Sequence, residues 1–311
     1  MNEWWLMQWG VSWLPPEART VWGWPIATAY VFAGTSGMIM FLAAYESWRR
    51  RAAALCRVGM IAGVVGIGMA VAVLVTDLGV PWRFLNLVIA LPNRLLSSPM
   101  TWGVLLLTVL PLLGLYAVMR GPEKRAVAAS VMLLGLLIAV YPGFLLNATS
   151  IALWNTYLPL LFLATSLSAA AAFMALTAGL VIAGPEERRS TIRRMETTAV
   201  VSTAAELVFL AMFLYAAGQD GRALPALRAL LGSPVGPYFW AGAALTVVAG
   251  AGLLFSVALR DREHQTGSGS LAGSFAVAAG GSFLLRASLF LAGFAAFSAM
   301  NPFGSYTIQL P

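Results

Sequence analysis

The segment VGMIAGVVGIGMAVAVLVTDLGVPWRF, residues 58–84, decides the fold class. It opens with a run of about 20 apolar residues, which is the length that an α-helix needs to cross the hydrocarbon core of a bilayer. The run ends at a carboxylate, Asp77, and the helix-breaking residues Gly79 and Pro81 follow, then an aromatic residue and an arginine. This pattern is typical of a hydrophobic helix that leaves a membrane.

Similar apolar runs recur along the whole chain. Of its 311 residues, 60% are hydrophobic and 10% are charged, and the mean hydropathy is +0.82. A soluble domain is about half apolar and about a quarter charged. The runs are continuous rather than alternating, which argues against a β-barrel. We therefore predict an all-α polytopic membrane protein, in which each helix satisfies its own backbone hydrogen bonds.

Eight transmembrane helices are predicted, and we expect them to form two four-helix bundles. The predicted spans are residues 24–47, 55–78, 100–119, 126–147, 153–182, 197–217, 237–259 and 271–299. A Trp-rich interfacial segment, residues 1–23, precedes this membrane domain of residues 24–299, and a tail over residues 300–311 follows it. Residues 1–23 do not show the basic start and short apolar core of a cleavable signal peptide.

The basic residues predict the orientation. Thirteen of the nineteen lie on one side, in the loops after the first, third, fifth and seventh spans. The positive-inside bias therefore places both termini outside and the arginine-rich loops in the cytoplasm. Insertion and contact with membrane lipid explain the net charge of +7, so we expect no nucleic acid as a partner.

The chain has few residues that could hold a metal or a redox centre. A single cysteine, Cys56, excludes an internal disulfide and a cysteine-ligated iron–sulfur cluster within the chain, and a single histidine, His264, excludes a haem held by two histidines. We expect no metal site. No nucleophile elbow and no phosphate-binding glycine loop is present in the sequence.

Charged residues inside the spans need a reason, because a charge at mid-bilayer costs several kcal/mol. Glu206 is near the middle of the sixth span and Arg286 near the middle of the eighth, so we expect the two to approach one another. They form either a buried ion pair that fixes the packing or, together with Glu46, stations on a proton path.

A second polar group is expected where spans reach the outer surface. Its members are Asp77, Tyr141, Asn147, Trp24, Thr28 and Trp154. A quinone needs apolar or aromatic walls, hydrogen-bond partners for its two oxygens and a group that exchanges protons, and Tyr and Asp supply these functions. The long outer loops, residues 79–99 and 218–236, are rich in proline and favour a docked partner. Arg83 and Arg94 are the expected docking residues.

Four motifs give the chain a family resemblance. They are Trp24-Pro25 with Tyr30, Gly34 and Gly37; Asp77-Leu78-Gly79 with Pro81, Arg83-Phe84, Ser98-Pro99-Met100 and Gly103; Tyr141-Pro142-Gly143 with Trp154-Asn155; and Leu285-Arg286-Ala287 with Gly293. In this order they resemble the NrfD-like membrane subunits of respiratory oxidoreductases, of which the polysulfide reductase membrane subunit is one type. That subunit has Asn and His where this chain has Ile26 and Ala29.

The resemblance implies an eight-helix, haem-free subunit of a bacterial or archaeal cytoplasmic (inner) membrane that binds menaquinone or ubiquinone. It implies a ferredoxin-like iron–sulfur subunit and a molybdopterin catalytic subunit as partners on the periplasmic side. By the same likeness, Tyr141 is a quinone-site residue and Arg286 lies in the inner channel. Two other functions stay open: a proton-conducting or transport subunit that uses Glu206 and Arg286, and a pure membrane anchor.

Overall fold

A computed structural model describes residues 24–77, 89, 99–120, 125–149, 151–232, 235–259 and 268–300. The N-terminal segment 1–23, the docking candidates Arg83 and Arg94, and the tail beyond Met300 lie outside these residues, as do His264 and the side chain of Asp77.

The described residues form nine helices and no strand. The helices are α2 (Trp24–Trp48), α3 (Ala53–Asp77), α6 (Pro99–Arg120), α7 (Arg125–Asn147), α8 (Leu158–Val181), α9 (Pro185–Gln219), α10 (Leu224–Leu231), α11 (Gly236–Leu259) and α12 (Ser268–Met300). All except α10 are long and apolar enough to cross a membrane. The predicted all-α class and the eight spans are thus confirmed.

Two helix starts and one loop differ from the prediction. The fifth span begins at Leu158 instead of residue 153, because residues 151–157 form turns and the Asn155 side chain accepts a hydrogen bond from the Tyr157 amide. The sixth begins at Pro185 instead of residue 197, so the arginines expected in a loop lie on α9. Proline at the start and acidic residues in the first turn favour this helix start. In addition, α10 lies within the predicted outer loop 218–236.

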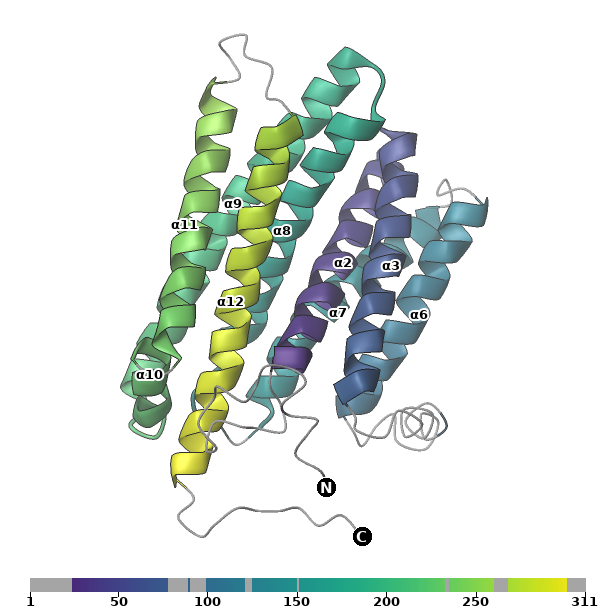
Figure 1. The fold of residues 1–311 in the computed structure, drawn as a ribbon. Coiled ribbons are helices and arrows are strands. Elements are labelled where there is room, and N and C mark those ends of the chain that lie inside the picture. The colour runs from purple at the N-terminus through teal and green to yellow at the C-terminus, as the bar shows by residue number, and fades with distance from the viewer. Residues whose placement is uncertain are drawn as a thin grey trace.

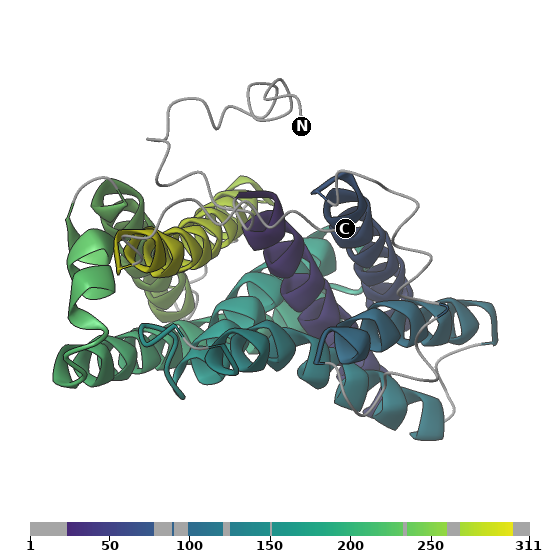
Figure 2. The same ribbon diagram turned by 90° about the horizontal axis from the view of Figure 1, so that it is seen from below.

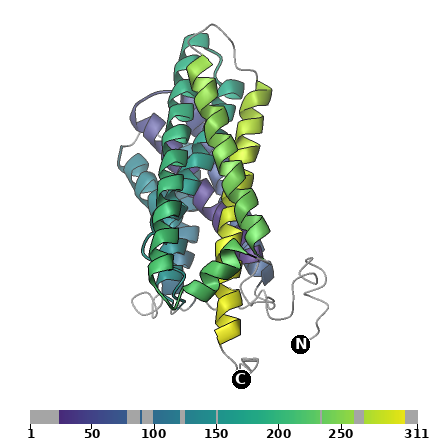
Figure 3. The ribbon, with the colours of Figure 1, turned by 90° about the vertical axis from the view of Figure 1, so that its left-hand side faces the viewer.

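The spans run alternately up and down (Figure 1). We call one end of the bundle the α10 end: there α2, α6, α8 and α11 begin and α10 lies across the bundle (Figure 3). We call the other the arginine-rich end, where α2 and α8 end and α9 begins. The spans before residue 148 pack mainly with one another, as do those after it, and α8 joins the two groups through α2, α7 and α12. Figure 2 shows α2 between α12 and the α3–α6 pair.

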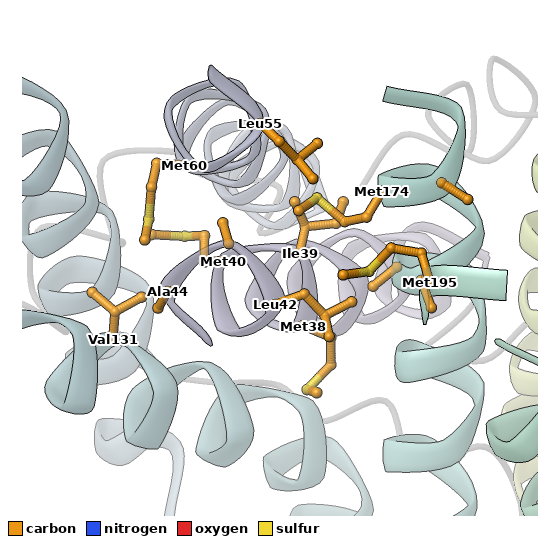
Figure 4. Packing of buried hydrophobic residues seen from close by; sticks show 14 of the residues in the cluster. Met38, Ile39, Met40, Leu42, Ala44, Leu55, Met60, Val131, Met174 and Met195 are labelled. Atoms are coloured by element: carbon orange, nitrogen blue, oxygen red, sulfur yellow. The ribbon is translucent and has the colours of Figure 1, made fainter. Parts of the chain in front are cut away.

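The packing core between the two groups is rich in methionine. Met38, Met40, Met60, Met174 and Met195 are buried in one cluster (Figure 4). Methionine is unbranched and fills irregular gaps between helices. A second cluster lies nearer the α10 end and is rich in aromatic residues instead. The aromatic cluster surrounds the residues that the sequence singled out.

Small residues allow α2 and α3 to approach closely, as expected for helices packed in a membrane. A Cβ at Gly59 would lie 2.9 Å from the Cβ of Ala43, and one at Gly63 would lie 2.9 Å from the sulfur of Met40. Gly68, on the same helix, would meet nothing within 4 Å. The α2-facing side of α3 is therefore set by packing.

Candidate functional site

The aromatic cluster at the α10 end is centred on Phe290 of α12. The Phe290 ring centroid lies 5.5 Å from that of Tyr30, 6.1 Å from that of Trp154 and 6.4 Å from that of Phe162. All four side chains are buried or nearly so. They come from α2, the turn before α8, α8 and α12, so the cluster joins the two helix groups.

Arg286 lies one helical turn before Phe290 on α12, on the side of the cluster away from the α10 end. Its side chain is fully buried. Its Nε donates to Thr165 Oγ1 at 2.9 Å and its Nη1 donates to the carbonyl of Tyr30 at 3.1 Å. Its Nη2 donates to the carbonyl of Phe162 at 2.8 Å and to Ser166 Oγ at 2.6 Å, and also to Thr165 Oγ1. The guanidinium carbon lies 5.0 Å from the Phe162 ring centroid. Neutral oxygens of two helices thus hold this cation.

Gly34 makes room for this arrangement. A Cβ at Gly34 would lie 2.5 Å from Ser166 Oγ and 3.2 Å from Nη1 of Arg286. Because the first distance is shorter than real Cβ contacts, α2 can pass Arg286 and Ser166 this closely only with glycine here. The same approach brings the Tyr30 carbonyl within reach of the guanidinium.

Among the described residues, no hydrogen-bonded ion pair joins Arg286 to Glu206, but the two charges interact electrostatically. Glu206 of α9 is buried and accepts a hydrogen bond from Thr246 Oγ1 of α11 at 3.1 Å. Each group is bound by neutral partners from its neighbouring helices. The sequence placed both near the middle of their spans but carried no information on their partners.

The depth of Arg286 is set by what it binds. Tyr30 and Phe162 lie roughly 9 Å and 6 Å along α2 and α8 from the α10 end, at 1.5 Å per residue. The guanidinium therefore lies in the third of the bundle nearest that end, although Arg286 is near the middle of its own helix. α12 continues to Met300, which explains the difference.

Tyr141 lies at the same depth, roughly 9 Å from the end of α7. The side chain is partly buried and packs against both core clusters. Its hydroxyl lies against α6, where a Cβ added to Gly103 would be 2.6 Å from the oxygen. Tyr141 and Tyr30 thus lie at one depth, and the backbone carbonyl of Tyr30 contacts the buried cation.

The other predicted quinone-site residues divide into two sets. Trp24 packs against the aromatic cluster, with its ring centroid 5.4 Å from Tyr238 and 5.6 Å from Phe283. Asp77 is the last residue of α3, one turn beyond Leu74, which packs against that cluster as well.

The remaining three have structural roles or stand apart. Trp154 is buried, and its Nε1 donates to the Leu289 carbonyl at 3.1 Å, which ties the turn before α8 to α12. The Thr28 hydroxyl donates to the Trp24 carbonyl of its own helix at 2.7 Å. Asn147 is the last residue of α7 and is partly exposed.

Glu46 lies far from this group, near the arginine-rich end. Its buried carboxylate receives two hydrogen bonds from Arg194 of α9, from Nη2 at 3.0 Å and from Nε at 3.4 Å. Arg194 also donates to Thr191 Oγ1. Glu46 therefore links α2 to α9, a role that a bidentate arginine–carboxylate pair fills well.

Sequence reasoning missed the neutral partners of the buried charges. Thr165, Ser166 and Thr246 are the most important of them. A signal was present for the first two, because the run Thr165-Ser166-Leu167-Ser168 puts three hydroxyls into an otherwise apolar span. Ser168 continues the polar run: its hydroxyl lies 2.8 Å from that of Thr203 on α9.

Comparisons with known proteins agree with this architecture. Residues 16–298 match the family described as "Polysulphide reductase, NrfD". The chain is also 29% identical over 280 residues to Protein NrfD of Escherichia coli strain K12, an alignment that covers 77% of this chain and 84% of that protein.

Proposed function

The chain belongs to the polysulphide reductase NrfD family, and from that membership we propose that it is the haem-free, quinone-binding membrane subunit of a respiratory oxidoreductase. It is a multi-pass integral protein of the bacterial inner membrane. Proteins of this family are membrane subunits that generally work with other respiratory subunits. Quinone exchange and the identity of the partner subunits are the parts that we propose.

One observation supports the quinone site best: Tyr141, Tyr30 and the Arg286 guanidinium share one depth at the α10 end. Trp24 and Leu74 pack against the same cluster, and Asp77 follows Leu74 by one helical turn. Aromatic and apolar side chains provide the walls that a flat quinone ring needs. The phenols and the carboxylate provide the polar contacts.

The proposed reaction takes two electrons and two protons per quinone reduced to quinol, or releases them in the other direction. The Tyr141 hydroxyl donates a hydrogen bond to a quinone oxygen, and Asp77 exchanges protons with the aqueous side. Arg286 is a fixed positive charge whose hydrogen bonds go to neutral oxygens, so it stabilises negative charge that develops nearby. Electrons pass to or from a partner, because this chain has no cysteine set for a cluster of its own.

We assign the partners to the α10 end. The positive-inside rule places that end outside, since the arginines gather at the opposite end. A ferredoxin-like iron–sulfur subunit docked there, with a molybdopterin catalytic subunit beyond it, would lie close to the proposed quinone site. Arg83 and Arg94 are our candidates for its docking contacts, and menaquinone or ubiquinone is the substrate.

Turnover in the assembled complex tests this proposal. We expect Tyr141→Phe and Asp77→Asn to lower quinone-linked turnover about 100-fold, the usual scale for a lost proton-transfer group. Turnover with a soluble dye should stay unchanged, because the dye bypasses the membrane site. Tyr215→Phe is the matched control, since Tyr215 is 71% exposed on α9. Normal quinone-linked turnover in both site variants would leave the chain as a membrane anchor.

A second function, proton conduction, is favoured by the buried polar side chains that lie between α8, α9 and α11. Glu206 with Thr246 and the Ser168–Thr203 hydroxyl pair lie between the Glu46–Arg194 pair and Arg286 along the chain's helices. Proton uptake during quinone turnover in vesicles distinguishes the two functions. Loss of uptake in Glu206→Gln, with turnover kept, would show that this path moves protons.

A further inference from the structure

A groove follows the α8–α9 face of the bundle. It encloses a cavity of about 350 Å³ between Leu160, Leu163 and Leu167 of α8 and Val201, Ala205 and Phe209 of α9. Leu160 and Val201 are 40% and 63% exposed, so the groove opens outward from the bundle. Since both helices span the membrane, its open side faces lipid.

A second cavity, of about 510 Å³, lies at the arginine-rich end between α2 and α9. Tyr45 and Glu46 line it from α2, and Ser190, Arg193 and Arg194 line it from α9. Thr197 and Thr198 line both cavities. The two therefore adjoin at these threonines, with a polar chamber on one side and an apolar trough on the other.

Two arginines and one carboxylate line the chamber. Arg194 and Glu46 form a bidentate ion pair and offset one another. Arg193 is exposed beside them, and Arg189 is exposed one helical turn earlier on the same side of α9. Basic pockets between transmembrane helices on the cytoplasmic side bind the headgroups of anionic lipids.

We propose that these two adjoining cavities bind one anionic phospholipid, with its phosphate at Arg193 and an acyl chain along the α8–α9 trough. The trough runs from Thr197 to Phe209, about 18 Å along α9. One leaflet contributes half of a hydrocarbon core about 30 Å thick. The trough thus matches the length of one acyl chain, and the basic chamber lies where its headgroup must be.

Lipid retention tests the proposal. The purified protein is placed in nanodiscs of phosphatidylglycerol and phosphatidylcholine, and the lipids that stay bound after release are counted by native mass spectrometry. We expect one phosphatidylglycerol per chain. Arg193→Gln should weaken its retention about fivefold, which corresponds to the roughly 1 kcal/mol that a basic residue contributes at the membrane surface.

Two further variants make the test specific. Ala205→Phe should displace the lipid by filling the trough, while Arg188→Gln, on the same helix but outside both linings, should retain it. Thermal unfolding checks that each variant is folded. If Ala205→Phe is not folded, the lipid retention of Arg193→Gln alone tests the proposal. Equal retention of the two lipids, unchanged retention in Arg193→Gln, or a quinone in place of the lipid would overturn the proposal.

Discussion

The backbone carbonyl of Tyr30 on α2 accepts a hydrogen bond from Nη1 of Arg286 on α12, at 3.1 Å. This bond joins the first membrane span to the last. The same guanidinium donates to Phe162, Thr165 and Ser166 of α8, so one buried side chain links three spans. The quinone site that we propose lies against this junction, which makes the stability of the junction the first thing to test.

Replacing Arg286 with lysine should loosen the junction. Lysine keeps the charge but lacks the planar fork that reaches α2 and α8 together, so several hydrogen bonds are lost. We expect Arg286→Lys to destabilise the protein by about 2 kcal/mol. Unfolding can be followed by maleimide labelling of Cys56, which is the sole cysteine and fully buried. The exposed Arg120, replaced by lysine, is the control and should unfold like the parent protein. If Arg286→Lys were as stable as the parent protein, the hydrogen bonds of Arg286 would not be what stabilises this junction.

Gly34→Ala should disturb the same junction from α2. The added methyl group would lie 2.5 Å from Ser166 Oγ, so Ser166 or the helix must move. Overpacking of this kind costs about 1–3 kcal/mol. Gly68→Ala is the matched control because it meets nothing within 4 Å, and we expect it to be neutral or slightly stabilising. Similar thermal stability of the two alanine variants would argue against the close approach at Gly34.

Thr246→Val should lower the stability of the protein, because it removes the hydrogen bond from Thr246 to Glu206. The variant keeps the shape of the side chain and removes the hydroxyl that donates to Oε1 at 3.1 Å. A buried polar group that loses its partner costs about 1–3 kcal/mol. In Thr108→Val the lost hydroxyl only donates to the Val104 carbonyl of its own helix, so a smaller change is expected. Denaturant or thermal unfolding compares the two, and an equal loss would mean that the Glu206 contact adds nothing.

Arg194→Gln should be more harmful than an exposed arginine change. It leaves the Glu46 carboxylate, which is 1% exposed, without its bidentate partner. Arg194 is itself 33% exposed, so water screens the pair and we expect a loss of about 1–2 kcal/mol rather than the full penalty of a dry ion pair. Arg222→Gln is the control: its partner Asp220 lies on the surface, and Arg222 holds the pKa of that carboxyl below its usual value. No change in stability is expected there.

Hydropathy predicted the eight spans because each helix is apolar over the thickness of the membrane, whether its side chains face lipid or the packed interior. It missed the start of α8, since Leu153 and Trp154 are apolar yet lie in turns that pack against α12. It also missed the first turns of α9, where charged residues are helical beyond the apolar stretch. A run of apolar residues indicates burial in lipid or in protein, but it does not determine the backbone conformation.

The candidate site was predictable in part. The sequence identified Tyr141 and Trp24, and both pack against the aromatic cluster. It predicted that Arg286 and Glu206 approach one another, and the two charges do interact, but serine, threonine and backbone oxygens accept the hydrogen bonds of the arginine. Which neutral oxygens lie within 3 Å depends on helix crossings that a sequence does not contain. Trp154 and Thr28 likewise have backbone partners that only the packing determines.

Photoaffinity labelling tests the central claim most directly. The assembled complex is illuminated with an azido-quinone, digested and mapped by mass spectrometry. We expect the label on the α10-end segments that carry Tyr141 and Trp24, reduced by excess quinone and by Tyr141→Phe but not by Tyr215→Phe. Label confined to the α8–α9 groove, or label that excess quinone does not displace, would contradict a quinone site at Tyr141.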